Sequence, residues 1–191
     1  MNLYGRLLLV LLRAWLGRAW FGRALEPLGM ARTPFHVWPH DLDLNAHMNN
    51  GRYATLMDLG RVDLMARAGL LPRIRHARMY PVVTAQHILY RRPLAPFRAF
   101  VLETEVIGWD ERFVYMEQRF VRGGRLHARG IMQALFIGPD GRVGSEALLR
   151  LFGVDDALPV PPAVATLFPP PPDEVSALNH APHPAEARRA A

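Results

Sequence analysis

The sequence has 191 residues, 50% of them apolar, so it can bury a sizeable core and is not a disordered chain. It contains no cysteine, which excludes disulfides, thiolate zinc sites and a cysteine nucleophile. The formal net charge is +6, and all 23 basic residues are arginine. A positive chain can attract nucleic acid, anionic lipid or phosphate-bearing ligands. These arginines are scattered and form no basic run interleaved with aromatic residues, so we expect no nucleic-acid partner.

Residues 1–30 combine an apolar run at 7–12 with regularly placed arginines. A membrane-spanning helix needs about 20 consecutive apolar residues, and Arg13 interrupts this segment too early. A signal peptide carries small residues after its apolar run, whereas this segment has Arg13 and Trp15 there. Two interpretations stay open. The segment is either an amphipathic helix lying on a membrane surface, or a helix that covers the domain or a neighbouring subunit.

The rest of the chain predicts one long helix and several strands. A strand is expected at 33–38, and a helix from about 49 to 68, where Gly69 and Pro72 supply stop signals. Runs rich in β-branched and aromatic residues predict further strands at 80–90, 100–109, 112–122 and 126–137. A short helix is expected at 145–152, with Ser145 as its N-cap.

The long helix has one largely apolar face, made of Tyr53, Leu56, Met57, Gly60, Leu64 and Ala68. Gly60 in the middle of that face would let the helix approach a sheet closely, at some cost in helix propensity. One long helix followed by antiparallel strands indicates an α+β fold, with a strongly curved sheet wrapped round a central helix. We expect this domain at 31–157, preceded by the helical segment 1–30 and followed by a mostly disordered, proline-rich tail at 158–191.

The densest set of chemically active groups lies at 40–53, between the first strand and the long helix. Asp43, Asn45 and His47 alternate, so in a locally extended loop their side chains would project to one side. A carboxylate, an amide and an imidazole that converge can activate water or attack a carbonyl. Unpaired amides near Asn49 and Asn50, at the helix start, can stabilise an oxyanion. Together these groups are typical of the hydrolysis of an activated acyl group.

The same residue types also serve purely structural roles. Asp, Asn and His are common in turns, and Asn49 or Asn50 could simply cap the helix. The two histidines and two aspartates within 40–47 are conceivable as a metal site, but no HExxH motif or tight cluster supports one. We therefore expect no metal and no cofactor.

Three segments resemble a known family. Residues 41–53, Asp-Leu-Asp-Leu-Asn-Ala-His-Met-Asn-Asn-Gly-Arg-Tyr, resemble the signature of hotdog-fold thioesterases and are close to a stretch of plant acyl-ACP thioesterases. Residues 88–97 are similar to the second-strand Arg-Pro-Leu segment of that superfamily. Gly108-Trp-Asp-Glu-Arg112, with Tyr115 and Glu117, resembles the family of thioesterase superfamily member 6. The resemblance extends over residues 31–140.

The resemblance implies a hotdog fold and a homodimer or tetramer with its site at a subunit interface. It assigns Asp43 as the catalytic carboxylate, acting as nucleophile or as general base on water, while Asn45 and His47 position substrate or water. The oxyanion and substrate-binding positions that it implies are Asn49, the amide of Asn50, and Asp58, which matches a recurrent acidic position.

The implied function is an acyl-CoA or acyl-carrier-protein thioesterase of lipid metabolism, cytoplasmic or peripheral to the inner membrane. The implied partners are the thioester substrate and a second copy of the chain. The apolar, arginine-bearing residues 1–30 predict a membrane surface as a further partner. An enoyl-thioester hydratase usually carries Asp-x-Asn-Pro-x-His, and the spacing from Asp43 to His47 without proline argues against it. A non-enzymatic lipid-binding protein is the third alternative, which the intact Asp-Asn-His set disfavours.

Overall fold

The structure is a computed structural model, and it describes residues 3–21, 25, 26, 28–154 and 158–168. The chain divides into a larger unit, Met1–Pro161, and a smaller one, Pro162–Ala191. In the smaller unit the described part is helix α5 (Pro162–Ala165) and a short turn after it. Most of the tail predicted to be disordered, residues 169–191, lies outside the described residues. The polar segment 40–53 belongs to the larger unit.

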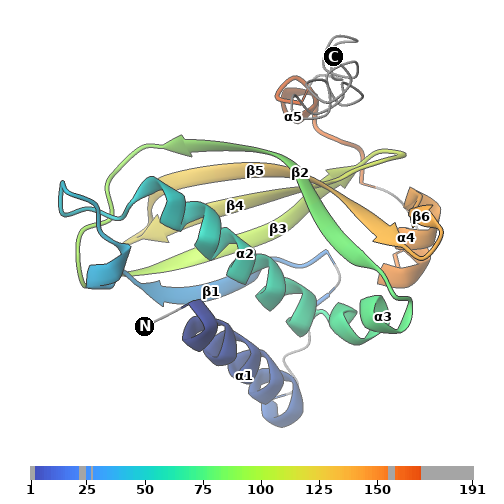
Figure 1. The fold of residues 1–191 in the computed structure, drawn as a ribbon, viewed down its shortest axis with the longest axis horizontal. Coiled ribbons are helices and arrows are strands. Elements are labelled where there is room, and N and C mark those ends of the chain that lie inside the picture. The colour runs from blue at the N-terminus through green and yellow to red at the C-terminus, as the bar shows by residue number, and fades with distance from the viewer. Residues whose placement is uncertain (1–2, 22–24, 27, 155–157, 169–191) are drawn as a thin grey trace, which may run out of the picture. The chain divides into compact units, whose positions relative to one another are not determined.

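The larger unit is built on an antiparallel sheet with the spatial order β1-β3-β4-β5-β2 and a short β6 beside β5. Its strands are β1 (Ala31–His36), β2 (Tyr80–Tyr90), β3 (Ala99–Trp109), β4 (Val114–Arg122), β5 (Arg125–Gly138) and β6 (Gly141–Arg142). The sheet curves around helix α2 (Asn50–Arg67), as Figure 1 shows. The predicted curved sheet around a central helix is therefore confirmed.

Helix α2 packs close to the sheet because Gly60 has no side chain. A Cβ atom built at Gly60 would lie 2.7 Å from Leu102 Cδ2 and 2.7 Å from Thr104 Oγ1, closer than such atoms pack. Leu56 and Met57 of the predicted apolar face are buried beside it. Gly60 thus has the role that the sequence predicted, and the close approach offsets its low helix propensity.

Two charged residues of α2 are buried as well, which the helical pattern did not predict. Asp63 accepts a hydrogen bond from Thr33 Oγ1 on β1 at 2.6 Å. Arg61 donates from Nη1 to Oε1 of Gln118 on β4 at 2.7 Å. Burial raises the pKa of Asp63 and lowers that of Arg61, because each charge is desolvated. Arg61 thus contacts the sheet through β4, and Asp63 contacts it through β1.

Helix α1 (Leu3–Phe21) lies alongside α2 and β1 (Figure 1). Its inner face buries Val10 and Ala14. Its outer face stays apolar and exposed, with relative exposures of 75% for Tyr4, 67% for Leu8 and 61% for Trp15. Among the described residues, no helix has the length and hydropathy required to cross a membrane. The helix therefore covers the domain, as one of the two interpretations held, and also presents an apolar surface.

Two local predictions need correction or addition. The helix at 145–152 is present as α4 (Ser145–Phe152), but its N-cap is Gly144, and no side chain caps it. Helix α3 (Leu70–His76) was not predicted, because Gly69 was interpreted only as a stop. Gly69 adopts a left-handed conformation that ends α2, and a new helix begins at the next residue. Pro72 is tolerated there because amides in the first turn have no intrahelical partner.

Candidate active site

The segment with the alternating Asp43, Asn45 and His47 is a tight turn and not an extended loop. Leu42 and Met48 form a bridge across its base, and the amide of Asp43 donates to His47 O at 2.9 Å. Ala46 has a positive φ of 56°, which closes the turn. The prediction of a locally extended loop is therefore wrong. The physical reason is that aspartate side chains bond backbone amides two or more residues on and so stabilise turns.

The carboxylate of Asp43 organises this turn from within. Its Oδ1 accepts hydrogen bonds from the amides of Asn45 at 2.8 Å and His47 at 3.3 Å. No residue in the described part of the chain donates a hydrogen bond to its Oδ2. Asp43 is half-buried, as is His47, whereas Asn45 is exposed. The Asp43 carboxylate is thus held in place through Oδ1, while its Oδ2 is left open to a ligand.

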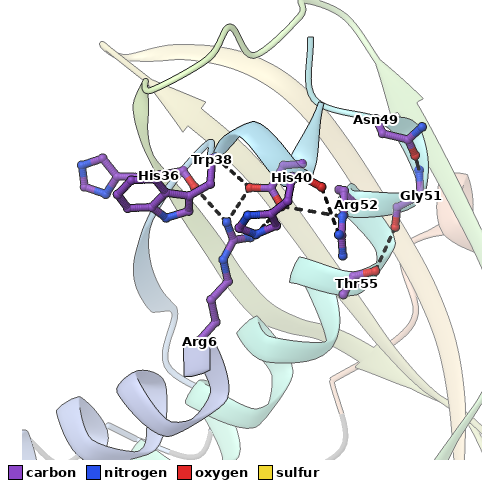
Figure 2. A network of polar contacts seen from close by, with 9 residues as sticks. Arg6, His36, Trp38, His40, Asn49, Gly51, Arg52 and Thr55 are labelled. Atoms are coloured by element: carbon purple, nitrogen blue, oxygen red, sulfur yellow. Dashed lines mark hydrogen bonds and ion pairs between the residues drawn. The ribbon is translucent and has the colours of Figure 1, made fainter. Parts of the chain in front are cut away.

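The first turn of α2 follows directly and carries an unpaired amide. Asn49 is the N-cap, and its Oδ1 accepts from the amide of Gly51 at 2.8 Å. The amide of Arg52 donates to Asn49 O at 2.9 Å. Figure 2 shows this first turn, with Thr55 Oγ1 donating to Gly51 O at 3.0 Å. The amide of Asn50 finds no acceptor within the described ranges, so it can donate to an anion at the positive end of the helix dipole.

A tyrosine pair flanks Asn50 and was not predicted as part of the site. Tyr90, the last residue of β2, donates from its hydroxyl to Asn50 O at 3.2 Å. Its ring meets Tyr53 of α2 edge-on, with centroids 5.0 Å apart. Burial raises the pKa of Tyr53 to about 12, so this hydroxyl stays protonated at neutral pH. The only signal in the sequence was the position of Tyr90 just before the Arg-Pro-Leu segment.

A second carboxylate of the motif, Asp41, lies at the base of the loop and is fully buried. It forms an ion pair with Arg6 of α1 and accepts from the amide of Trp38 at 2.9 Å. Asp41 ends the short 3₁₀ turn η1 (Pro39–Asp41), 35 residues after Arg6, so no local pattern indicates their contact. Figure 2 shows Arg6 reaching from α1 towards this turn. Asp41 therefore has a structural environment that differs from that of Asp43.

Asp58 does not join the loop residues. It lies on α2 eight residues after Asn50, which is about 12 Å along the helix axis at 1.5 Å per residue. Its carboxylate is exposed and pairs with Arg61. Both line an apolar cavity of about 180 Å³ under the second half of α2, whose wall includes Val83, Met132 and Phe136. Asp58 thus lines an apolar cavity alongside α2 and lies apart from the loop that carries Asp43.

Comparison with known proteins identifies the family. The sequence model of the thioesterase-like superfamily matches residues 37–177 of this chain. The chain belongs to the thioesterase-like superfamily. It is also similar to Protein THEM6 of Danio rerio, with 44% identity over 82 residues, which are 43% of this chain and 41% of that protein. It is similar to Thioesterase poxG of Penicillium oxalicum, with 25% identity over 108 residues, or 49% and 36% of the two chains. The chain thus spans about two-fifths of the length of these curated relatives.

Solved thioesterase structures share the fold. The YbaW probable thioesterase from Escherichia coli superposes with a TM-score of 0.57 and 21% identity, covering 63% of this chain and 94% of that one. The BH1999 gentisyl-coenzyme A thioesterase gives a TM-score of 0.57 at 15% identity, covering 63% and 99%. At such identities the likeness shows the fold alone. The predicted α+β hotdog fold and the predicted family, close to that of THEM6, are confirmed.

Proposed function

We propose that this protein is a thioester hydrolase that acts on an acyl-CoA or an acyl-carrier protein. The observation that carries the proposal is that two groups near the start of α2 are available to a substrate, in a chain of this superfamily. Asp43 keeps one carboxylate oxygen open, and the Asn50 amide lacks an acceptor among the described residues. A carboxylate supplies the base or nucleophile, and a helix N-terminal amide stabilises the oxyanion of the tetrahedral intermediate.

The reaction would proceed by addition and elimination at the thioester carbonyl. As a general base, Asp43 takes a proton from water while the water oxygen attacks the carbonyl carbon. The negative charge that develops on the carbonyl oxygen is held by the Asn50 amide. The intermediate then expels the thiolate, which takes up the proton, and free acid and thiol leave. As a nucleophile, Asp43 would instead attack the carbonyl carbon and break the C–S bond, so that the thiolate leaves and takes up a proton from solvent. The resulting anhydride between Asp43 and the acyl group is then hydrolysed by water to the free acid and the regenerated Asp43 carboxylate. His47 and Asn45 are proposed to position substrate or water.

Two features fit the two ends of such a substrate. The apolar cavity beside Asp58 offers space for an acyl chain. Arg91 and Arg92 follow directly after Tyr90, whose hydroxyl reaches Asn50, so they bring positive charge near the start of α2. Arginine donors suit the phosphates of CoA or of a carrier-protein prosthetic group.

We propose in addition that the working form is a homodimer joined through β2. This strand is at an edge of the sheet, and within the described residues only β5 pairs with it. It exposes Tyr80, Val82, Val83 and Leu89. An exposed, apolar edge strand is an aggregation hazard unless another strand covers it, and a second copy would do so. Light scattering at micromolar concentration should give at least twice the mass of the chain. A monomeric mass would contradict this proposal.

We further propose that α1 places the protein on an anionic membrane surface while the enzyme itself stays in the cytoplasm. The support is the exposed apolar face with Tyr4, Leu8 and Trp15, beside the exposed cation Arg13. Aromatic and aliphatic side chains next to arginine are typical of helices that lie in a membrane interface. Flotation with anionic liposomes should recover the wild type and lose a Leu8→Ser, Trp15→Ser variant. Equal flotation of both proteins would show that this face is not the contact.

The proposed activity is tested by turnover of a panel of acyl-CoA thioesters with short, medium and long chains by the purified full chain. We expect release of free thiol from at least one chain-length class. If the protein binds acyl-CoA but hydrolyses none, the non-enzymatic lipid-binding alternative replaces the hydrolase.

A further inference from the structure

A buried ion pair joins α1 to the base of the candidate catalytic loop. The side chains of Arg6 and Asp41 are 5% and 0% exposed, although they are 35 residues apart in sequence. Arg6 Nη2 donates to Oδ2 of Asp41 and also to His36 O at 3.3 Å. A carboxylate taken out of water is stable as an ion only when it is paired and hydrogen-bonded. Helix α1 therefore supplies the charge that Asp41 requires in this position.

Asp41 in turn holds both ends of the loop. On its entry side, Oδ2 accepts from the amide of Trp38 at 2.9 Å. On its exit side, the backbone oxygen of Asp41 accepts from the amide of Asn49, the N-cap of α2, at 2.8 Å. The turn that contains Asp43 lies between these two contacts. A third contact, the hydrogen bond from the Met48 amide to Leu94 O at 3.0 Å, also holds this turn in place.

Arg52 ties the first turn of α2 to the same residue. Its Nη2 donates to His40 O at 3.0 Å, and its Nε lies 3.6 Å from Oδ1 of Asp41. That oxygen accepts no hydrogen bond in the described part of the molecule, so Arg6 supplies the direct side-chain bond to the buried carboxylate. Figure 2 shows Arg6 and Arg52 approaching this turn from two different helices.

We infer that Arg6 and Asp41 are positioning residues, through which α1 sets the place of Asp43 relative to the Asn50 amide. The inference rests on the proposed function, because it concerns the geometry of that same site. A buried ion pair contributes little net stability compared with apolar packing, but it can fix one arrangement of the chain. A displacement of about 1 Å at a reacting centre can reduce a rate by about a hundredfold. Losing the pair should therefore affect turnover beyond its effect on folding.

The test measures kcat and KM of Arg6→Gln and Arg6→Lys with a soluble acyl-CoA, well below their thermal midpoints. We expect kcat of Arg6→Gln to fall about 10- to 100-fold, with KM changed less than about twofold. Arg6→Lys keeps the buried charge and hence the fold, but one ammonium matches the geometry of Asp41 and His36 O less well, so its kcat should lie in between. Arg142→Gln, an exposed arginine in β6, is the control and should keep the wild-type kcat.

If both Arg6 variants keep the wild-type kcat and only unfold at lower temperature, the pair is merely structural and the inference is overturned. If the wild type hydrolyses no thioester, the proposed function fails. Amide hydrogen exchange then tests separately whether Arg6 and Asp41 hold the loop in place. Faster exchange of Arg6→Lys confined to residues 42–52 supports it. Unchanged exchange there, or equally faster exchange throughout β3, β4 and β5, contradicts it.

Discussion

Asp41 and Asp43 are two residues apart in the motif, but the base and the tip of their loop have different physical environments. At the base, Asp41 is fully buried and paired with Arg6. At the tip, Asp43 is half-buried and bonds backbone amides, next to Leu44, whose side chain is fully exposed. A carboxylate held by a guanidinium in the interior is unavailable as a base, whereas one with an open oxygen can meet a substrate. Burial and partners, and not order in the motif, therefore distinguish the two carboxylates.

The largest expected effect on stability comes from Asp41→Asn, which breaks the base of the loop. It leaves the Arg6 charge buried without its anion, which typically costs about 3–5 kcal/mol of unfolding free energy. Urea denaturation measures this loss. Asp43→Asn is the comparison, because its amide oxygen can still accept both backbone bonds; we expect a change within about 0.5 kcal/mol. Equal losses in both variants would remove the distinction between base and tip.

A smaller effect is expected at Asn49, where the loop passes into α2. Asn49→Ala removes the side-chain oxygen that accepts from the Gly51 amide and should cost about 1 kcal/mol. Asn49→Asp retains a capping oxygen and should unfold at nearly the wild-type urea concentration. If the alanine variant is as stable as the aspartate variant, the cap does not contribute to holding the helix start.

A still smaller change in unfolding free energy is expected when pH is lowered, and at the base of the loop it comes from His40. Burial lowers the pKa of His40 from 6.5; Asp41 opposes the shift, while Arg6 and Arg52 add to it. The unfolded chain therefore binds a proton on His40 more readily than the folded chain. Stability is fully present above pH 6.5 and falls as pH decreases below it. Unfolding free energies at several pH values should show this loss in the wild type and less of it in His40→Gln. Identical pH profiles would contradict the assignment.

The smallest effect is expected at the tip. Leu44 has a relative exposure of 106%, so Leu44→Ser should change the unfolding free energy by no more than about 0.5 kcal/mol. A larger loss in the isolated chain would mean that the tip is packed in solution. Denaturation at two protein concentrations would then show whether a second copy covers it.

The sequence predicted those parts of the fold that rest on periodic patterns. The face of α2, the close approach at Gly60 and the five long strands follow from spacings of 3.6 and 2 residues. It missed α3 because a left-handed glycine can separate two helices without an intervening loop. It also missed the pairing of Arg6 with Asp41, since no local pattern encodes a contact across 35 residues.

For the candidate site, the sequence located the segment but not its geometry. Alternation of Asp43, Asn45 and His47 suggested a locally extended loop, whereas the side chain of Asp43 bonds the amides of its own loop and folds it into a turn. The role of Asn49 as a helix cap was one of the alternatives that the sequence left open, and it is confirmed. The assignments of Asp43, Asn45, His47, Asn50 and Asp58 to catalysis or binding stay predictions.

The most direct test of the central claim is the kcat of Asp43→Asn on the acyl-CoA that the wild type hydrolyses best. The substitution keeps the shape and the turn but removes the charge, so kcat should fall about 10²- to 10⁴-fold while KM stays near the wild-type value. Asp140→Asn, an exposed aspartate in the turn before β6, is the matched control and should retain full activity. Turnover by Asp43→Asn at the wild-type rate would contradict the account and place the chemistry elsewhere in the molecule.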